Sequence, residues 1–395
     1  MKIKRIHTYI AKVELGKKRF FSSQCAFPQR NSMLVCIETD NGLMGWGEGG
    51  QYGPAEPVAA CVEHVLAPML LGRDPLMRDV LWNDMYCATR DFGQKGSYIE
   101  AISAIDIALW DLCGKAMNVP ITTLLGGRQR NDVATYATGC YYRGEDYLNP
   151  EANLENLAAE AQSYVKDGFR MLKIKVGLLS IEEDATRVKA IRRAVGTDVK
   201  LFVDCNHAYN AYTAVRMGRV LQDEGILFME EPVPPEDHEG YRRVRSQLNL
   251  AIAGGECEYT RYGFKRFIDD ECVDIIQPDL CVCGGFSEFQ KIAAQASAAG
   301  VAVLPHVWGS GIALAAALSA IAALPNFPHT ANPIPLQNEP AVEYDKNMNP
   351  LRDELLDTHF QLEHNRLVVP QGAGLGVTVN LDVLNRYTVA HAVCE

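Results

Sequence analysis

The sequence predicts an α/β fold in which a closed barrel of parallel strands follows an α+β domain, and the spacing of five ionisable residues carries this prediction. Each of these residues ends a short apolar run between positions 200 and 306; they are Asp204, Glu230, Glu256, Asp279 and His306. Successive members lie 26, 26, 23 and 27 residues apart, enough for one strand, one helix and two loops. The carboxyl ends of parallel strands meet at one rim of a barrel, so we expect these side chains around one mouth.

The amino-terminal region, residues 1–125, reads as a separate α+β domain. Two strand-like runs, at 2–15 and 32–48, are joined by a polar loop, and an Asn-Gly pair at 41 and 42 is typical of a hairpin turn. Helical patterns follow, and the clearest runs from 97 to 117, where apolar residues recur at helical spacing. This domain is therefore expected to be a strand meander followed by helices.

From about residue 130 strands alternate with helices, a pattern that implies a parallel sheet. Strands are predicted at 133–139 and 171–176, ahead of the five runs named above. The predicted helices cover residues 150–167, 181–195, 211–224, 236–248, 260–270, 285–299 and 310–324. About eight strands favour a closed barrel over an open doubly wound sheet, which would also carry a Gly-rich phosphate turn. The barrel is placed at residues 126–360, and the tail, 361–395, is expected to pack back on the first domain.

Composition and charge exclude several classes of function. The chain has 395 residues, 48% of them hydrophobic, and a net charge of −11 without a Lys/Arg block, so a nucleic-acid or anionic-membrane partner is not expected. Its 12 cysteines are dilute and form no C-x-x-C pair, which indicates reduced thiols. The first ten residues lack a signal-peptide core, and the longest apolar stretch, 312–324, is shorter than the roughly 20 residues that span a bilayer. A cytoplasmic location is therefore expected.

Asp204, Glu230 and Glu256 predict a metal site. Three carboxylates at one barrel mouth repel each other and raise each other's pKa unless a cation lies between them. Mg²⁺ suits such oxygen ligands where water and substrate oxygens complete the octahedron. One such acid alone would fit a solvated strand end or a helix N-cap, but three on successive units favour a site. Glu231 follows Glu230, and the spacing favours Glu230 as the inward residue.

Two further pairs supply candidate proton-transfer groups. Lys173 and Lys175 lie two apart on one strand and so face the same way. A like charge nearby lowers a lysine pKa, which allows Lys175 or Lys173 to act as a general base. Asp279 and His306 end consecutive strands, where a hydrogen bond between them would fix the imidazole tautomer and raise its basicity.

Together these groups predict an enzyme that abstracts the proton α to a carboxylate. A metal would hold a carboxylate or lactone carbonyl, while a lysine and a histidine reach the two faces of the α-carbon. Elimination and inversion by a racemase or epimerase both remain open, because two opposed bases serve either reaction. A non-catalytic barrel is disfavoured, since all three acids, both lysines and the histidine–aspartate pair are present.

Six motifs in order make the chain resemble the mandelate racemase subgroup of the enolase superfamily. They are K-I-K at 173–175, D-C-N at 204–206, E-E-P at 230–232, G-G-E at 254–256, Q-P-D at 277–279 and P-H-V-W-G at 305–309. The amino-terminal G-W-G-E (45–48) and S-A-I-D-I-A-L-W-D (103–111) extend the resemblance. It implies a capping domain over a modified TIM barrel, (β/α)7β, with the three acids binding Mg²⁺ and Lys175 opposed to His306. It also implies an electrophilic glutamate from the last strand, for which Glu343 is the best match and Glu339 the alternative register.

Within the subgroup, segments 90–96, 204–209, 277–293 and 305–311 look closest to galactarolactone cycloisomerases. That resemblance implies β-elimination that opens a sugar-acid lactone, with an acid-sugar dehydratase, which expels water, as the alternative. It implies a small-molecule partner and a homo-oligomer, often an octamer. The residues expected to contact substrate are Gln24, Arg30, Gln51, Tyr52 and Gln94 in the capping domain and Asn206, His207 and Trp308 on the barrel.

Overall fold

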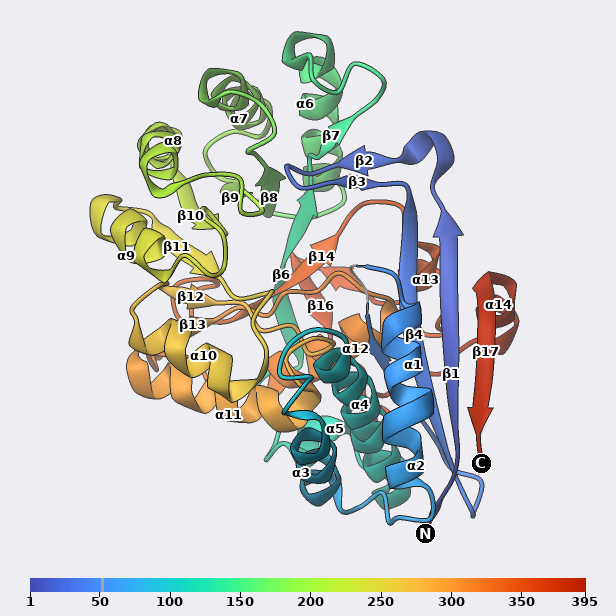
Figure 1. Cartoon of the computed structure of the whole chain (residues 1–395). Coiled ribbons are helices and arrows are strands. Elements are labelled where there is room, and N and C mark those ends of the chain that lie inside the picture. Colours follow the sequence, from blue (N-terminus) through green and yellow to red (C-terminus); the bar gives the residue numbers. More distant parts are fainter. Residues whose placement is uncertain (51–52) are drawn as a thin grey trace.

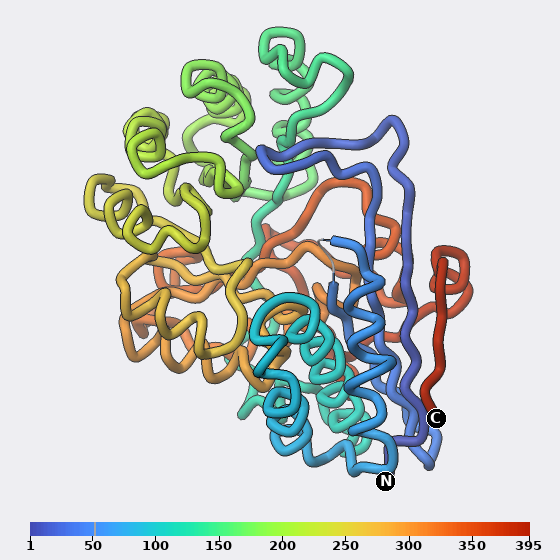
Figure 2. The backbone as a smooth tube through the Cα atoms, viewed as in Figure 1, coloured from blue at the N-terminus to red at the C-terminus, as the bar shows by residue number. Residues whose placement is uncertain are grey.

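The computed structural model describes residues 1–50 and 53–395, and its amino-terminal part is built on a four-stranded antiparallel sheet. The strand order is β17-β1-β4-β5. The bounds are Ile3–Glu14 for β1, Gln29–Thr39 for β4, Met44–Gly49 for β5 and Thr388–Cys394 for β17. The last strand of the chain therefore lies beside the first, as the red and blue segments in Figures 1 and 2 show.

Helices cover one face of this sheet. They are α1 (Glu56–Cys61), η2 (Val62–Leu66), α2 (Ala67–Leu70), α3 (Arg78–Thr89) and α4 (Ser97–Met117). The glycines at 45, 47 and 49 on β5 face α4, and a Cβ at any of them would meet the α4 backbone. The G-W-G-E motif thus lets the longest helix of this domain approach the sheet closely.

The second part is a barrel of eight parallel strands alternating with seven helices over the described residues from 132 to 345, which confirms the predicted (β/α)7β fold (Figure 1). The strands are β6 (Asp132–Gly139), β8 (Met171–Lys175), β9 (Lys200–Asp204), β10 (Ile226–Glu230), β11 (Ala251–Gly254), β12 (Ile275–Ile276), β13 (Ala302–Val303) and β14 (Ala341–Asp345). The helices are α6 (Pro150–Lys166), α7 (Ile181–Val195), α8 (Ala211–Asp223), α9 (His238–Gln247), α10 (Thr260–Asp269), α11 (Gly285–Ala299) and α12 (Gly311–Ala323). β14 returns to pair in parallel with β6, the first barrel strand.

The barrel interior below the rim is filled with apolar side chains. Phe202 and Phe228 stack there with ring centroids 4.3 Å apart, and Tyr136 packs edge-on against Phe202. These residues belong to a buried cluster that includes Ala134, Met171, Ala253, Ile275, Leu304 and Ala341. The charged groups at the rim therefore lie on a floor of low polarity, which strengthens the interactions among them.

Short elements connect the two parts. A small sheet joins β2 (Phe20–Phe21) and β3 (Ala26–Phe27) to β7 (Tyr142–Arg143), so a hairpin of the first domain reaches the barrel rim. The remaining short elements are η1 (Gly16–Lys18), α5 (Ile121–Leu124), α13 (Pro350–Asp353), β15 (Leu362–Glu363), β16 (Arg366–Val368) and α14 (Leu381–Tyr387). The tail from residue 361 contributes strands to both parts of the molecule. β16 pairs with β6 and extends the barrel sheet, and β17 pairs with β1 in the sheet of the first domain.

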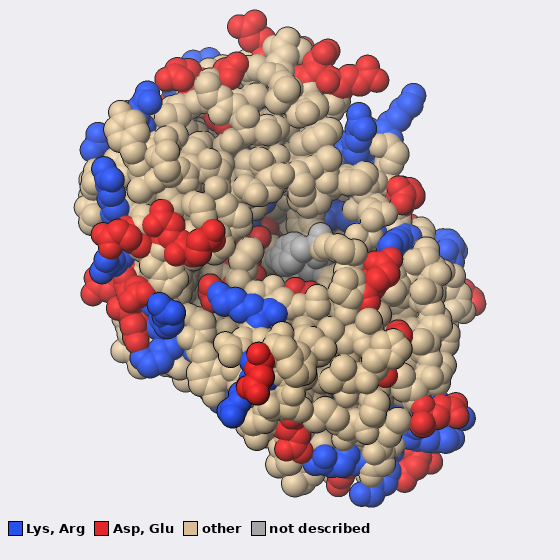
Figure 3. Space-filling view, viewed as in Figure 1, with Lys and Arg blue, Asp and Glu red and all other residues tan. Residues whose placement is uncertain are grey.

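Surface charge on the face seen in Figure 3 is mixed, with Lys and Arg interspersed among Asp and Glu. None of the helices in the described residues combines the length and apolar character that a membrane crossing needs.

Asp106 on α4 joins the first domain to the barrel. Its carboxylate accepts the Ser287 backbone N–H at 3.0 Å and the Ser287 hydroxyl at 2.6 Å, at the start of α11. Burial raises the pKa of Asp106 from 3.8 to about 7, although the bonds to Ser287 act in the opposite direction. The folded protein therefore holds a proton on Asp106 at a pH where the unfolded chain has lost it.

This raised pKa predicts that stability falls as pH rises between about 4 and 7. The folded-state pKa exceeds the unfolded value, so the loss across this window is on the order of 4 kcal/mol. Asp106→Asn, which has no such ionisation, should flatten the decline, and urea unfolding midpoints at pH 5 and pH 8 measure it. The exposed control Asp91→Asn should keep the wild-type slope; an equal decline in Asp106→Asn would contradict the assignment.

Candidate active site

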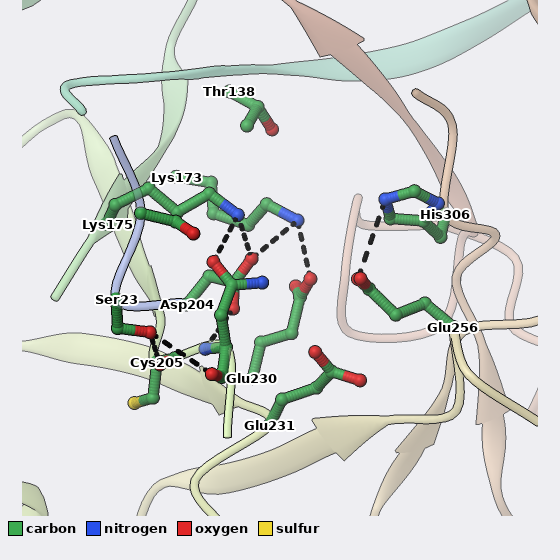
Figure 4. Close-up of polar contacts among 12 residues, drawn as sticks. Ser23, Thr138, Lys173, Lys175, Asp204, Cys205, Glu230, Glu231, Glu256 and His306 are labelled. Carbon is green, nitrogen blue, oxygen red and sulfur yellow. Dashed lines mark hydrogen bonds and ion pairs between the residues drawn. The ribbon is translucent and has the colours of Figure 1, made fainter. Parts of the chain in front are cut away.

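Adjacent strands place the lysines and the three acids that the sequence predicts as metal ligands at one level of the rim. Lys175 on β8 pairs in register with Asp204 on β9, and Asp204 pairs with Glu230 on β10. Glu256 follows β11 by two residues. Oxygens of the three acids lie within 4.8 Å of one another, and all three side chains are buried (Figure 4).

This carboxylate cluster fits a divalent cation. Its donor atoms are all oxygens, which hard cations such as Mg²⁺ prefer. The buried Oε2 of Glu256 has no hydrogen-bond partner in the described part of the chain. Burial raises the pKa of Glu230 to about 8; Lys173 opposes this shift, and the nearby acids Asp204, Glu343 and Glu256 add to it. A cation between the acids would coordinate this oxygen and relieve their repulsion.

Both lysines point into the cluster. Lys173 Nζ lies 2.6 Å from Glu230 Oε1 and 3.8 Å from Asp204 Oδ2. Lys175 Nζ donates to Asp204 Oδ2 and, at 3.0 Å, to Asn206 Oδ1. These ion pairs compensate the positive charges of the two buried lysines.

The lysine electrostatics differ from the sequence expectation. Burial, the largest effect, and Lys173 both act to lower the pKa of Lys175, but Asp204, Tyr141 and Glu256 together outweigh them, so its pKa is raised rather than lowered. Burial likewise lowers the pKa of Lys173, and Glu230 and Glu343 reverse the effect. The K-x-K pattern reveals that each lysine has a like charge nearby, but it does not reveal the acids on other strands that face the lysines. A bound cation would offset those acids and lower both lysine pKa values.

His306 and Asp279 meet on the other side of the cluster. Nδ1 of His306 lies 2.7 Å from Asp279 Oδ2, and Nε2 lies 3.5 Å from Glu256 Oε2. Figure 4 shows the lysines on one side of the carboxylates and His306 on the other. Burial acts to lower the His306 pKa, but Glu256 and the bond to Asp279 outweigh it and raise that pKa to about 9.

The last barrel strand contributes Glu343. Its Oε1 lies 2.8 Å from Lys173 Nζ and accepts the Thr138 hydroxyl, while Oε2 lies 4.0 Å from His306 Nε2. Glu339 instead ion-pairs with Arg366, at the start of β16. The register therefore brings Glu343, and not Glu339, to the site.

The residues expected to contact substrate lie in different surroundings, and Asn206 has already been placed beside Lys175. Gln24 reaches the rim, where its Nε2 donates to the Asn206 carbonyl, and Gln94 is exposed. His207 turns toward Glu231, with Nε2 and Oε2 3.2 Å apart. The remaining predictions are Arg30 and Trp308, treated next, and Gln51 and Tyr52, which lie outside the described residues.

Arg30 lies in β4 rather than in a loop, and it is buried. Its guanidinium pairs with Asp345 at the end of β14 and lies 4.3 Å from the Trp308 ring centroid. Trp308 also packs against Phe27 of the β2–β3 hairpin, with centroids 5.3 Å apart. These contacts hold the hairpin over the rim.

Four neighbours of the site were not predicted. Gln277 Nε2 donates to Glu230 Oε2 at 2.6 Å, and the Tyr141 ring lies 5.0 Å from Lys175 Nζ. Thr138 contacts Glu343, and Ser23 Oγ donates to the Cys205 carbonyl at 2.7 Å. Gln277 belongs to the Q-P-D motif and could have been found from it. Ser23 carries no sequence signal, because its partner is distant along the chain.

Glu48 anchors the segment that carries His306. From β5 it accepts the Ser310 backbone N–H at 2.9 Å, the Ser310 hydroxyl at 2.6 Å and the Ala313 N–H at 3.1 Å. These donors form the first turn of α12, four residues beyond His306. A buried carboxylate at a helix N-terminus satisfies otherwise free N–H groups.

Replacing Glu48 by Ala should destabilise the protein by on the order of 3 kcal/mol, because buried donors lose their acceptor. Denaturant unfolding followed by circular dichroism measures the change. Glu155→Ala, at an exposed position on α6, is the matched control and should have little effect. Equal midpoints for Glu48→Ala and the wild type would show that Glu48 does not anchor α12.

Fold and site together define a class: a capped (β/α)7β barrel enzyme whose rim carries a carboxylate cluster suited to a divalent cation. Residues 5–126 match the family model of the mandelate racemase / muconate lactonizing enzyme N-terminal domain, and residues 156–383 match the enolase C-terminal domain-like model. The chain belongs to the mandelate racemase / muconate lactonizing enzyme family of the enolase superfamily.

Relatives with named activities span almost the whole chain. It is 41% identical over 387 residues to D-galactarolactone cycloisomerase of Agrobacterium fabrum, covering 98% of this chain and 99% of the relative. It is 39% identical over 351 residues to arabinonate dehydratase of Saccharolobus solfataricus, covering 89% of each.

Solved structures of the enolase superfamily have the same overall fold as this chain. The 3,6-anhydro-D-galactonate cycloisomerase of Zobellia galactanivorans is similar with a TM-score of 0.87 and 40% identity, covering 99% of this chain and 100% of that one. An L-talarate dehydratase from Polaromonas sp., complexed with Mg and L-glucarate, has a TM-score of 0.83 and 26% identity, covering 100% of this chain and 99% of that one.

Proposed function

We propose that the protein is a Mg²⁺-dependent cycloisomerase that opens a sugar-acid lactone by β-elimination. The observation that carries this proposal is the arrangement of Lys175 and His306 on opposite sides of the acids Asp204, Glu230 and Glu256. The 41% identity to a galactarolactone cycloisomerase supports the substrate class. Mg²⁺, when bound by the three acids, would stabilise the negative charge that develops on the substrate carboxylate.

The side chains of this protein divide the proton transfers between them. One of Lys175 and His306 takes the proton from the α-carbon, and its bonding electrons form the α,β double bond as the β-oxygen leaves. In a lactone that oxygen belongs to the ring ester, so the ring opens and the product is an isomer. The other of the two groups lies on the side from which a proton can be delivered, and the substrate's configuration decides which group removes the α-proton.

Neighbouring residues position these groups. Asp279 holds the His306 ring through Nδ1, and Asn206 holds Lys175. Lys173 and Glu343 form an ion pair beside the cluster. Glu343 would stabilise an oxygen that gains negative charge as the protonated acid, by donating a hydrogen bond to it. Gln24 and Gln94 are the described capping-domain residues that we assign to the substrate side.

The alternative is an acid-sugar dehydratase, favoured by the identity to arabinonate dehydratase. The same proton abstraction then expels a β-hydroxyl as water. An epimerase would use both bases without a leaving group. Product mass separates water loss from the isomeric outcomes, and NMR separates ring-opened product from epimer.

A substrate screen tests the proposal. Purified protein with Mg²⁺ is incubated with aldarolactones, aldarates and aldonates, and products are followed by NMR and mass spectrometry. We expect a ring-opened isomer from an aldarolactone, and turnover that chelation abolishes and Mg²⁺ restores. Loss of water from an open-chain acid, without lactone turnover, would replace the proposal by the dehydratase. The predicted homo-oligomer and the domain boundaries at 125 and 360 stay predictions, which sedimentation velocity and limited proteolysis can test.

A further inference from the structure

A second group of side chains of the types that bind metals lies next to the carboxylate cluster. His207, Glu231 and Cys257 follow the site residues Asn206, Glu230 and Glu256 by one position each. His207 and Glu231 have positive φ angles of 63° and 44°, and Cys257 lies in a turn, so the chain bends just beyond each of these strand ends. The ligand atoms of these three residues lie within 4.8 Å of one another, so they form a cluster of their own.

The separations inside this cluster match a tetrahedral zinc site. His207 Nε2 lies 3.2 Å from Glu231 Oε2, and Cys257 Sγ lies 3.7 Å from His207 Nε2. In tetrahedral coordination, Zn–N and Zn–O bonds of about 2.0 Å and a Zn–S bond of about 2.3 Å place N and O about 3.3 Å apart, and N and S about 3.5 Å apart. The three side chains therefore need little movement to share one ion.

Glu231 independently indicates a missing partner. Its side chain is 1% exposed, and neither oxygen has a hydrogen-bond partner in the described part of the chain. The 3.2 Å contact with His207 does not have hydrogen-bond geometry. Figure 4 draws no polar contact between Glu231 and the other residues shown. A buried carboxylate without hydrogen bonds is costly, and a cation between it and the imidazole would satisfy it.

We propose that His207, Glu231 and Cys257 form a second metal site that takes Zn²⁺ or a cation of similar softness. A thiolate and an imidazole exclude Mg²⁺ and favour zinc, so the two adjacent clusters select different metals. The ion would tie together the segments that follow β9, β10 and β11, where each ligand lies one to three residues beyond an acid of the first cluster. The second site thus positions the acids of the first, and it does not depend on which substrate the enzyme uses.

Cobalt(II) is the probe that tests this site, because thiolate coordination gives it a charge-transfer absorption in the near ultraviolet. Protein in excess Mg²⁺ is titrated anaerobically with Co²⁺. We expect one equivalent to bind with the thiolate band, Zn²⁺ to remove the band, and further Mg²⁺ to leave it unchanged. Cys257→Ala should lose the band, and His207→Gln should weaken Co²⁺ binding by at least about 10-fold. Cys87→Ser, which changes an exposed cysteine on α3, should bind as the wild type does.

Circular dichroism of each variant serves to check that it is folded. Cys257→Ala and His207→Gln change ligands on two different segments, so they test the site independently. Absence of a thiolate band in the wild type would overturn the proposal. A band that persists in folded Cys257→Ala, or one that Mg²⁺ displaces, would also overturn it. Unchanged Co²⁺ affinity in His207→Gln would overturn it as well, because the histidine would then not be a ligand.

Discussion

Asp204→Asn is expected to abolish Mg²⁺ binding and to lower kcat/KM by at least about 10³-fold. Asp204 is the central acid of the cluster, since it contacts both lysines and pairs in register with Glu230. Losing its charge would remove one of the proposed metal ligands and free Lys175, and metal stabilisation of the developing charge is worth several kcal/mol. Isothermal calorimetry with Mg²⁺ and steady-state turnover of the substrate found in the screen measure the two effects.

The control for this substitution lies at the opposite end of the same strand. Asp198→Asn changes an exposed acid just before β9 and should keep Mg²⁺ affinity and turnover. Glu256→Gln should behave as Asp204→Asn does, because Glu256 carries a buried oxygen that has no hydrogen-bond partner among the described residues. If Asp204→Asn and Glu256→Gln bound Mg²⁺ as tightly as the wild type, the cluster would not be the metal site.

Lys175→Ala and His306→Asn should each lower turnover by about 10²- to 10⁴-fold, the range that a positioned acid or base supplies. Their effects on the α-proton should differ. The variant that lacks the abstracting base should lose exchange of that proton with solvent. The variant that lacks the acid should keep exchange and lose elimination. Deuterium uptake by NMR, measured beside product formation, separates the two roles.

Lys189→Ala removes an exposed lysine from α7 and should leave both reactions unchanged. The double variant Lys175→Ala/His306→Asn should show neither exchange nor product. Full activity in the double variant would contradict the two-base mechanism for any substrate.

Local patterns were sufficient to predict most of the barrel. The helix predicted at 181–195 is α7, because Ser180 and Glu183 form a capping box and the apolar face is regular. Likewise Asn210 caps α8 and Asp237 caps α9. The strand runs before Asp279 and His306 were longer in the sequence than in the structure, where β12 and β13 have two residues each. Apolar runs mark buried chain, and only part of that chain makes ladder hydrogen bonds.

Contacts between distant segments could not be predicted. Arg30 pairs with Asp345, 315 residues away, and is buried in a strand, whereas the sequence placed it in the polar loop between the two strand runs. Glu48 bonds Ser310 across 262 residues. The raised pKa of Lys175 has the same origin, since the acid that sets it lies on the next strand. Spacing shows which residues share a rim, while the partners of each charge depend on the assembled fold.

The most direct test of the proposed chemistry is NMR of the α-proton when an aldarolactone is treated with the protein and Mg²⁺ in deuterium oxide. We predict loss of the α-proton signal together with the appearance of a ring-opened product that arises without net loss of water, both dependent on Mg²⁺ and on Lys175 and His306. Ring opening with the α-proton retained would indicate simple hydrolysis of the lactone and would contradict proton abstraction as the function of this site.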